Sequence, residues 1–485
     1  MYDQETIVAI STPPGRGGIG IVRLSGSGAK QIAEPMLRLR QPLAHAQARV
    51  GEILDRESGG KLDQVVVTYF AAPRSYTGED VVEIAAHGAP VILQALVEQA
   101  LAGGARLAEP GEFTQRAFLS GRIDLTQAEA VRDLIEAQTL YQARIAAQQM
   151  EGALSRRTQP IKQQLVDLIA LLEAGIDFAE DDLEVTAKEE ILRRMAEVRT
   201  ALQPVAESFD RGRIIHSGLT LAIVGRVNAG KSSLFNCLVE RERAIVTAAP
   251  GTTRDLVTER VSLGGIPVEL VDTAGLRPAP DHAQDRADSD HEGEPADEAE
   301  RIGIAKSREA MASADIVLLV LDATREPGPE EMKLLAALES RRAIVIVNKI
   351  DLAPSTAAPG SSPSAVPGSW RSALRGSLPT SQPVVAASAV TREGVDALRA
   401  RILEMVRGSH GEAESGMLTN LRQSEAVASA LASLAAAERA AGADVPHEML
   451  LLDLYEALRG LDSLTGETTA DDILSKIFST FCIGK

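Results

Sequence analysis

The sequence predicts a multidomain protein with an N-terminal α+β domain, an all-α helical domain, and an α/β domain of the P-loop type inserted into the helical one. Three observations lead to this prediction. A chain of 485 residues is long enough for about three domains. Two stretches with helical periodicity flank a third in which apolar strands alternate with helices. A glycine-rich phosphate-binding pattern lies inside that third stretch.

Residues 1–120 are expected to form the α+β domain, because short apolar runs alternate there with glycine and proline. A helix is predicted over Pro90–Ala102. The predicted strands are Thr6–Ile10, Gly20–Leu24, Gln64–Phe70 and Val81–Ala85.

The helical domain is expected in two parts, residues 121–217 and 409–485. In the first part, apolar side chains such as Val131, Leu134 and Ile135 recur at helical spacing. A domain is easily inserted where the ends of the host chain lie close together. We therefore expect the two parts to form one helical domain.

Residues 218–408 are expected to form the inserted domain, a mainly parallel sheet with helices on both faces. Two stretches in it differ in composition: 278–299 has eight acidic residues against one arginine, and 353–383 has six prolines and eight serines with two charges. Both predict solvated, mobile insertions. The predicted strands are Thr220–Val224, Val268–Val271, Ile316–Asp322, Ala343–Asn348 and Val384–Ala387.

The composition excludes several classes of protein. A formal net charge of −18 argues against binding of nucleic acid over the whole surface, so any RNA contact needs a local patch or a partner. Two cysteines cannot make a disulfide scaffold. The apolar runs are too short for a membrane span and the N-terminus lacks a basic secretory region, so we expect a cytoplasmic protein without membrane contact. Trp370, the single tryptophan, lies in the Pro/Ser-rich stretch and is expected to be a poor folding probe.

Residues 225–232 have the pattern of a phosphate-binding loop. The loop follows a predicted strand, Leu219–Val224, and precedes a predicted helix, Ser233–Leu238, which is the context that such a loop requires. Its glycines let backbone N–H groups face the phosphates, Lys231 reaches the β and γ oxygens, and the hydroxyl of Ser232 binds Mg²⁺.

Further motifs follow at the ends of later strands. Asp272-Thr273-Ala274-Gly275 puts a carboxylate on the magnesium side of the site and a glycine near the γ-phosphate. In the segment from Asn348 and Lys349 to Asp351, the Asp351 carboxylate can accept two hydrogen bonds from guanine, and adenine lacks that donor pair. Ser388 and Ala389 would complete the base pocket through a backbone N–H. Because open α/β sheets bind ligands at the carboxyl ends of their strands, the motifs together predict a GTP site.

The α/β segment resembles the translation-factor-related class of small GTPases. That resemblance implies that Pro250 to Thr253 form the first switch, with Thr253 completing the magnesium shell. Leu276 stands where Ras-like enzymes have the glutamine that orients the attacking water. Another group must therefore take over the catalytic role of that glutamine. This chain, a partner or a bound cation would supply it.

The whole chain resembles the MnmE family, also called TrmE, of tRNA modification GTPases in the TrmE-Era-EngA-YihA-Septin-like class. The resemblance rests on the interrupted domain order and on a set of specific segments. These are Thr12 to Arg23, Tyr76 to Asp80 with His87-Gly88, Gly111 to Phe118, Leu125 to Ala130, Glu300 to Ile304 and the final Cys482-Ile-Gly-Lys485.

The resemblance implies a homodimer that acts with the flavoprotein MnmG, which carries FAD. Together they add a carboxymethylaminomethyl or aminomethyl group to C5 of the wobble uridine of certain tRNAs. The one-carbon donor is a 5-formyl- or 5,10-methylene-tetrahydrofolate, bound by the N-terminal domain. The implied folate contacts are Arg23, Glu83, Arg122 and Lys485, and Arg122 stands where relatives often have lysine. These side chains suit folate chemically. A carboxylate can accept hydrogen bonds from the donors of the pterin edge, and basic side chains can pair with the anionic glutamate carboxylates.

Hydrolysis in the family uses K⁺ beside the phosphates, where a cation can neutralise developing charge, together with GTPase-domain dimerisation. The implied K⁺ ligands are Asn228, Thr247, Ala249 and Thr252, and Glu300 is implied to position the water, with Lys231 and Asn228 as further catalytic groups. The implied GTP contacts are Asn228, Ala229, Gly230, Lys231, Ser232, Ser233, Thr247, Ala248, Ala249, Pro250, Gly251, Thr252, Thr253, Asp272, Thr273, Ala274, Gly275, Asn348, Lys349, Asp351, Ser388 and Ala389.

The role of Cys482 remains open, and two other functions remain candidates for the whole chain. A thiolate could add to a pyrimidine ring, but Lys485 is the one nearby residue in sequence that would lower the thiol pKa, so a packing or folate-site role for Cys482 is favoured. A ribosome-assembly or signalling GTPase that switches RNA binding is a second candidate, although such proteins usually carry a basic RNA-binding domain. A folate-dependent one-carbon transferase with an inactive nucleotide domain is a third, which the complete motif set disfavours.

Overall fold

The computed structural model divides the chain into two compact units. Unit 1 comprises Met1–Ile135, Ala146–Ala206 and Leu421–Lys485, and unit 2 comprises Glu136–Ile145 and Glu207–Asn420. Within these units the structure describes residues 5–56, 58–177, 187–239, 257–272, 311–339, 341–353, 366–377, 382–407, 415–443, 445–467, 474 and 477–484.

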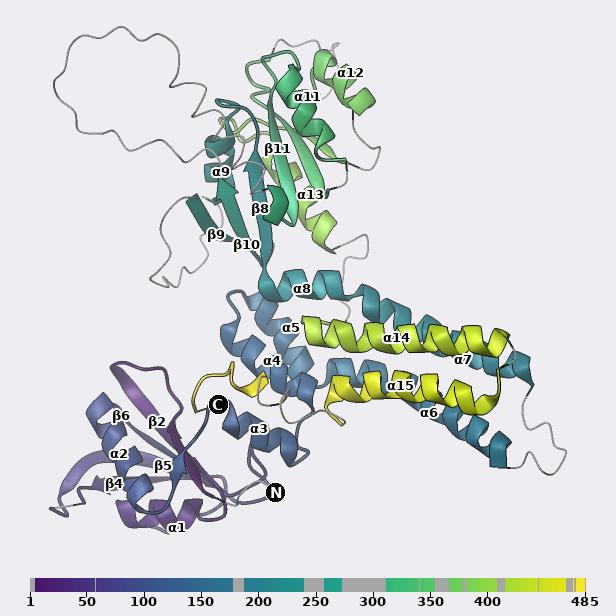
Figure 1. Cartoon of the computed structure of the whole chain (residues 1–485). Helices are drawn as coiled ribbons and strands as arrows, with labels where there is room; N and C mark the ends of the chain where they lie inside the picture. The colour runs from purple at the N-terminus through teal and green to yellow at the C-terminus, as the bar shows by residue number, and fades with distance from the viewer. Residues whose placement is uncertain are drawn as a thin grey trace, which may run out of the picture. The chain divides into compact units, whose positions relative to one another are not determined.

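A seven-stranded sheet forms the N-terminal part of unit 1 (Figure 1), in the order β3-β4-β5-β6-β2-β1-β7. Its strands are antiparallel except that β1 pairs with β7 in parallel. Their bounds are β1 Ile7–Ile10, β2 Gly17–Ser25, β3 Leu37–Leu39, β4 Gln47–Leu54, β5 Lys61–Phe70, β6 Val81–Gly88 and β7 Arg106–Leu107.

Helix α2 (Pro90–Ala102) packs its apolar face on this sheet, as its buried Leu93 and Leu96 show. A Cβ at Gly20 of β2 would lie 2.5 Å from Leu93 Cδ1, so the glycine makes room for the helix. A short helix α1 (Ala29–Ala33) and a 3₁₀ turn η1 (Glu34–Met36) add to the same core.

The rest of unit 1 is helical, and the helices from both sides of the inserted segment pack together. Helix α15 contacts α14 and α6, and Arg422 at the start of α14 forms an ion pair with buried Glu129 of α4 at 2.7 Å. The two helical parts therefore form one body, as the sequence predicted. The helices are α3 Glu112–Leu119, α4 Leu125–Glu136, α6 Ala153–Asp177, α7 Lys188–Glu207, α14 Leu421–Gly442 and α15 His447–Thr465. Helix α5, Leu140–Met150, begins in unit 2 and ends in unit 1.

Unit 2 contains a six-stranded sheet in the order β13-β12-β11-β8-β10-β9. Every pairing is parallel except that of β10 with β9. The elements are α8 Phe209–Ser217, β8 Leu219–Val224, α9 Lys231–Val239, β9 Val257–Leu263, β10 Ile266–Asp272, β11 Ile316–Asp322, α11 Pro329–Ala336, β12 Ala343–Asn348, α12 Gly368–Ser377, β13 Val384–Ala386 and α13 Val395–Arg407.

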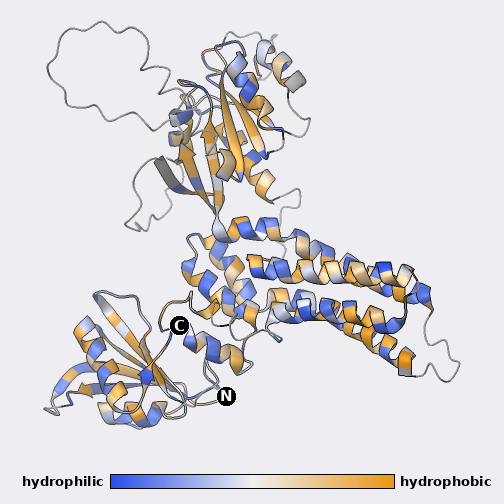
Figure 2. Ribbon diagram, viewed as in Figure 1, coloured by the Kyte–Doolittle hydropathy of each residue, from blue (hydrophilic) through white to orange (hydrophobic). Residues whose placement is uncertain are grey.

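Alternate residues of the central strands enter two hydrophobic clusters, one on each face of this sheet. One cluster joins residues such as Ile223 and Leu318 to helices α9 and α13, and the other joins Val224 and Leu319 to α11 and α12. Figure 2 shows these strands as nearly continuous apolar segments. Burial on both faces explains this pattern, which is typical of parallel sheets under helices.

A short upstream segment, 136–145, belongs to unit 2. The Thr139 hydroxyl donates to the carbonyl of Gly265 at 2.6 Å, and the Gln142 side-chain amide donates to the carbonyls of Ile215 and His216, both at 2.9 Å. The unit therefore includes residues from within the predicted first helical part, 121–217.

The structure differs from the prediction for the stretch 353–383. Helix α12 forms inside it, and the indole of Trp370 is buried in the cluster under that helix. The composition rule missed the helix because a few apolar side chains at helical spacing outweigh the surrounding serines and prolines. The expectation of a solvated, mobile insertion was wrong for the part that forms α12, and burial of Trp370 there also contradicts the expectation that it is a poor folding probe. The stretch 278–299 lies outside the described residues.

Within the described residues, no helix is both long and apolar enough to cross a membrane.

Candidate functional site

The glycine-rich loop between β8 and α9 has the geometry of a phosphate cradle. Gly225 has φ +148° and Gly230 has φ +92°, both in the region that favours glycine. A Cβ at Gly230 would lie 2.2 Å from Asn348 Nδ2, and one at Gly225 would lie 2.3 Å from the carbonyl oxygen of Val320. Only glycine fits at either position, so the loop stays close to the neighbouring strand ends.

Lys231 lies across this loop. Its ammonium donates to the carbonyls of Gly225 and Arg226, at 2.9 and 2.8 Å. Ser232 and Ser233 are exposed on the first turn of α9, where backbone N–H groups and the helix dipole favour an anion. The loop, the lysine and the two hydroxyls thus fit the phosphates of a nucleotide with its Mg²⁺.

The side chain of Asn348 joins two loops of unit 2. This residue is only 1% exposed at the end of β12. Its Nδ2 donates to the carbonyl of Ala229 at 3.0 Å, and its Oδ1 accepts from the N–H of Ala389 at 3.1 Å. One buried amide therefore fixes the phosphate loop and the Ser388–Ala389 loop relative to each other.

Ser388 and Ala389, predicted to complete the base pocket through a backbone N–H, follow β13. The N–H of Ala389 donates to Asn348 and that of Ser388 to the carbonyl of Glu393 at 2.9 Å. Ser388 is fully buried, and its hydroxyl accepts from the N–H of Thr391 at 3.1 Å. Asp351, predicted to read the guanine edge, is exposed at the start of the following loop. The base side of the site is thus preformed around Asn348 and Ser388.

Lys349 bridges the base side and the phosphate side. Its backbone is left-handed, with φ +65°, and its ammonium donates to Asp322 Oδ2 at 2.7 Å and to the carbonyl of Asn228 at 2.5 Å. Asn228 is also left-handed, with φ +64°. Burial raises the pKa of Asp322, but hydrogen bonds from Lys349 and Thr324 outweigh it and hold that pKa below its usual value.

Several predicted nucleotide contacts lie outside the described residues, namely Thr247, Ala248, Ala249, Pro250, Gly251, Thr252, Thr253, Thr273, Ala274, Gly275 and Glu300. Asp272 is described through its backbone, as the last residue of β10 beside Ile223 of β8. The switch and potassium assignments therefore remain predictions.

A second candidate site is a cavity of about 420 Å³ in unit 1, lined by Phe70, Arg74, Ser75, Tyr76, Val81, Glu83 and Arg122. Two of the predicted folate contacts, Glu83 and Arg122, thus line one cavity. A third, Arg23, is the cross-strand neighbour of Glu83 in the β2–β6 pairing and binds its carboxylate at 2.8 Å. The guanidinium of Arg122 donates to the carbonyl of Pro73 at 3.0 Å.

The cavity has further lining residues that were not predicted to be functional, namely Phe70, Arg74 and Ser75. Tyr76 also lines it, and its hydroxyl lies 3.0 Å from the Thr114 hydroxyl. Burial raises the pKa of Tyr76 above its usual value, so the phenol is neutral at pH 7. Two aromatic side chains in the lining, beside a carboxylate and a guanidinium, suit a planar heterocycle with donor and acceptor edges.

The C-terminal segment reaches the same region of unit 1. Ile483 forms a β-bridge with Pro110, and Arg23 Nη1 donates to the carbonyl of Gly484 at 3.4 Å. A Cβ at Gly484, which has φ +93°, would lie 2.4 Å from the carbonyl oxygen of Ile10. The chain therefore leads to the neighbourhood of the Arg23–Glu83 pair, although Lys485 itself lies outside the described residues.

Cys482 is exposed in this segment. Its carbonyl accepts from the N–H of Gly111 at 3.4 Å, while the ring of the preceding Phe481 packs on Phe478. The segment thus holds its place mainly through its backbone and the aromatic side chain, which leaves the role of the thiol open.

Glu112 has a structural role in the segment Gly111 to Phe118. Its carboxylate is buried and receives the guanidinium groups of Arg106 at 2.6 Å and Arg116 at 2.9 Å. Burial raises the pKa of Glu112, but the two arginines and a backbone N–H outweigh it and lower that pKa below its usual value. The network secures the start of α3 beside the cavity.

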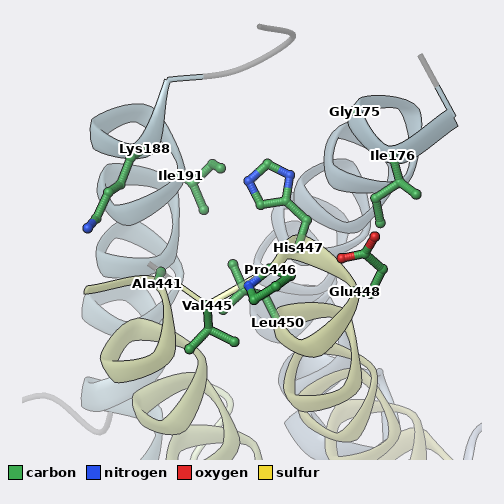
Figure 3. A pocket seen from close by; sticks show the side chains of 10 residues that line it. All are labelled: Gly175, Ile176, Lys188, Ile191, Ala441, Val445, Pro446, His447, Glu448 and Leu450. Atoms are coloured by element: carbon green, nitrogen blue, oxygen red, sulfur yellow. The ribbon is translucent and has the colours of Figure 1, made fainter. Parts of the chain in front are cut away.

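A further cavity of about 390 Å³ lies at the ends of bundle helices, lined by Gly175, Ile176, Lys188, Ile191, Ala441, Val445, Pro446, His447, Glu448 and Leu450. Figure 3 shows these side chains. The Lys188 ammonium donates to the carbonyl of Gly442 at 3.1 Å. None of the residues predicted to be functional lines this cavity.

Comparison with known proteins assigns the chain to one family. Two family models match, the GTP-binding protein TrmE N-terminus over residues 6–122 and the MnmE helical domain over residues 125–482. The tRNA modification GTPase MnmE of Koribacter versatilis (strain Ellin345) is 58% identical over 485 residues, covering 99% of each chain. The chain belongs to the MnmE family of tRNA modification GTPases. The family resemblance drawn from the sequence and the predicted fold class are thereby confirmed.

Other MnmE proteins match over the full length as well. The tRNA modification GTPase MnmE of Symbiobacterium thermophilum is 42% identical over 488 residues, covering 99% of this chain and 100% of that protein. Among solved structures, Era of Aquifex aeolicus bound to GDP and AlF₄⁻ is 23% identical, covering 44% of this chain and 66% of that chain with a TM-score of 0.29.

Proposed function

We propose that this chain hydrolyses GTP in unit 2 and couples hydrolysis to modification of carbon 5 of the wobble uridine in certain tRNAs. The observation that carries the GTP part is the Asn348 junction, where one buried amide joins the phosphate loop to the base loop. Membership of the MnmE family supports the tRNA part.

In this proposal the residues of the cradle bind and orient the nucleotide. Lys231 turns from the loop carbonyls to the β and γ oxygens, and Ser232 with Thr253 would hold Mg²⁺, which neutralises phosphate charge when bound. Asp351 selects guanine through its donor pair. The exposed hydroxyl of Ser232 and the glycine cradle support this fit.

Hydrolysis is proposed to be stimulated by K⁺ and by dimerisation of the GTPase units. Asn228, Thr247, the carbonyl of Ala249 and Thr252 would hold the cation, and Glu300 would orient the attacking water. Asn228 supports this because it is exposed and left-handed beside the cradle. A fixed positive charge there would stabilise the transition state as an arginine finger does.

The cavity of unit 1 is proposed to bind a tetrahydrofolate one-carbon donor. Glu83 would accept hydrogen bonds from the pterin edge, while Arg122 and Lys485 would pair with the glutamate carboxylates. The Arg23–Glu83 pair orients that carboxylate. The partner would be the flavoprotein MnmG with its FAD, acting with a homodimer of this chain to attach a carboxymethylaminomethyl or aminomethyl group.

The test is GTP turnover by the purified chain in potassium or sodium chloride at equal ionic strength. We expect potassium to raise the rate by about tenfold or more, because it supplies charge stabilisation of the size expected of such groups. The Asn228→Ala variant should lose this stimulation. Asn236→Ala, which changes an exposed asparagine of α9, should keep it. Equal rates in both salts for the wild type would contradict the potassium proposal.

A further inference from the structure

Helix α12 is tied to the nucleotide site through its tryptophan. The Trp370 side chain is 1% exposed and lies under α12 against the sheet. Its indole N–H donates to the backbone carbonyl of Asp322 at 3.0 Å. Asp322 is the last residue of β11, at the edge of the sheet where the nucleotide loops lie.

Asp322 in turn holds the lysine that bridges the two sides of the site. Its carboxylate, whose side chain is 13% exposed, accepts from Lys349 Nζ at 2.7 Å. The same ammonium donates to the carbonyl of Asn228 in the phosphate loop. A non-glycine residue in the left-handed region, as Lys349 is, stays there only when its surroundings hold it. A shift of Asp322 would therefore release both Lys349 and Asn228.

We propose that Trp370 is a positioning residue for guanine nucleotide binding, acting through Asp322 and Lys349 on the phosphate loop. The inference rests on the proposal that unit 2 binds GTP. The inference goes further than that proposal, because it states that a buried side chain of the Pro/Ser-rich stretch raises the affinity for the nucleotide. The indole supplies two things that a phenyl ring would not supply together, bulk in the cluster and a donor aimed at the end of β11.

The test compares Trp370→Phe with the wild type in GDP affinity and GDP dissociation rate, measured with a fluorescent GDP analogue. Phenylalanine keeps most of the apolar volume and removes the N–H. We expect GDP affinity to fall about three- to tenfold, the size of one lost buried hydrogen bond. The change should lie mainly in a faster dissociation rate, because encounter with the nucleotide is unaffected.

The matched control is Leu374→Ala on the same helix. Leu374 is buried in the same cluster and makes no polar contact with the strand end through its side chain. It should lower the thermal midpoint with little change in GDP affinity. If Leu374→Ala weakens GDP binding as much as Trp370→Phe, or if Trp370→Phe binds GDP like the wild type, the proposal is overturned.

A further test uses only the wild-type protein, so its result does not depend on whether a variant folds. Trp370 is the single tryptophan of the chain, so its emission reports on the end of β11 alone. We expect saturating GDP to change the emission intensity and ATP at the same concentration to leave it unchanged. Unchanged emission in a protein that binds GDP would overturn the inference, whereas failure of the wild type to bind GDP at all would overturn the proposed function with it.

Discussion

The nucleotide site of unit 2 and the cavity of unit 1 are assembled in opposite ways. The nucleotide site uses short runs of neighbouring residues, each placed at the carboxyl end of a strand in one parallel sheet. At the cavity of unit 1, the lining residue Glu83 binds Arg23 across antiparallel strands, and Arg23 also contacts Gly484 from the other end of the chain. A site made of local loops leaves a motif that can be read from the sequence. A site made by register and by a returning terminus leaves separate residues that only a structure, or a family resemblance, brings together.

The largest effect is expected at the junction of the nucleotide loops. Asn348→Ala leaves the carbonyl of Ala229 and the N–H of Ala389 without the side chain that now binds both. Ala229 is buried and Ala389 half-buried. A lost partner costs each group about 1–3 kcal/mol, so GDP affinity should fall by roughly 30-fold or more. GDP titration of the variant measures this loss, with the exposed Asn236→Ala as control. A loss below about threefold would mean that the junction does not control the site.

A smaller effect on ligand affinity is expected from a change in the C-terminal segment. It should weaken folate binding in unit 1 and leave GDP binding in unit 2 unchanged. Gly484→Ala forces the segment away from the carbonyl of Ile10, because the left-handed backbone and the 2.4 Å approach exclude a Cβ. We expect the affinity for 5-formyl-tetrahydrofolate, measured by calorimetry, to fall about tenfold, the size of one lost charged contact. GDP affinity should stay at the wild-type value. Gly442→Ala, which meets nothing nearby, is the control, and an unchanged folate affinity in Gly484→Ala would contradict the placement of the terminus at this site.

The smallest effect concerns stability beside the cavity. Glu112→Gln removes a carboxylate whose pKa is lowered in the folded chain, so its contribution is complete above the unfolded value near 4.5 and is lost as the pH falls through the folded value. We expect a loss of about 1–3 kcal/mol at pH 7. Denaturant unfolding of unit 1 at pH 7 and below pH 4 measures it. The difference from the wild type should shrink in acid, and a constant difference would exclude the ionic origin.

The strands that the sequence predicted well are those buried on both faces. The apolar runs of β8, β11 and β12 have the bounds Leu219–Val224, Ile316–Asp322 and Ala343–Asn348 in the structure, as expected. The polar strand β4 was missed, since its outward residues face solvent and interrupt the apolar pattern. Helix α12 was not predicted, because the Pro/Ser-rich composition of its stretch was given more weight than the helical spacing of its few apolar side chains. Pairing across a sheet, such as Arg23 with Glu83, depends on register, which the sequence of one strand does not contain.

The ten residues of segment 136–145 bear on how the GTPase part could be prepared by itself. A fragment cut at the motif boundaries, 218–408, would lose Thr139, whose hydroxyl donates to the carbonyl of Gly265. It would also lose Tyr141, which packs on the hydrophobic cluster of the sheet. A longer fragment that keeps α8 would still lack Gln142, which binds the carbonyls of Ile215 and His216. A recombinant fragment that behaves like the intact unit must therefore be discontinuous in sequence, with the upstream peptide supplied in trans or fused through a new linker.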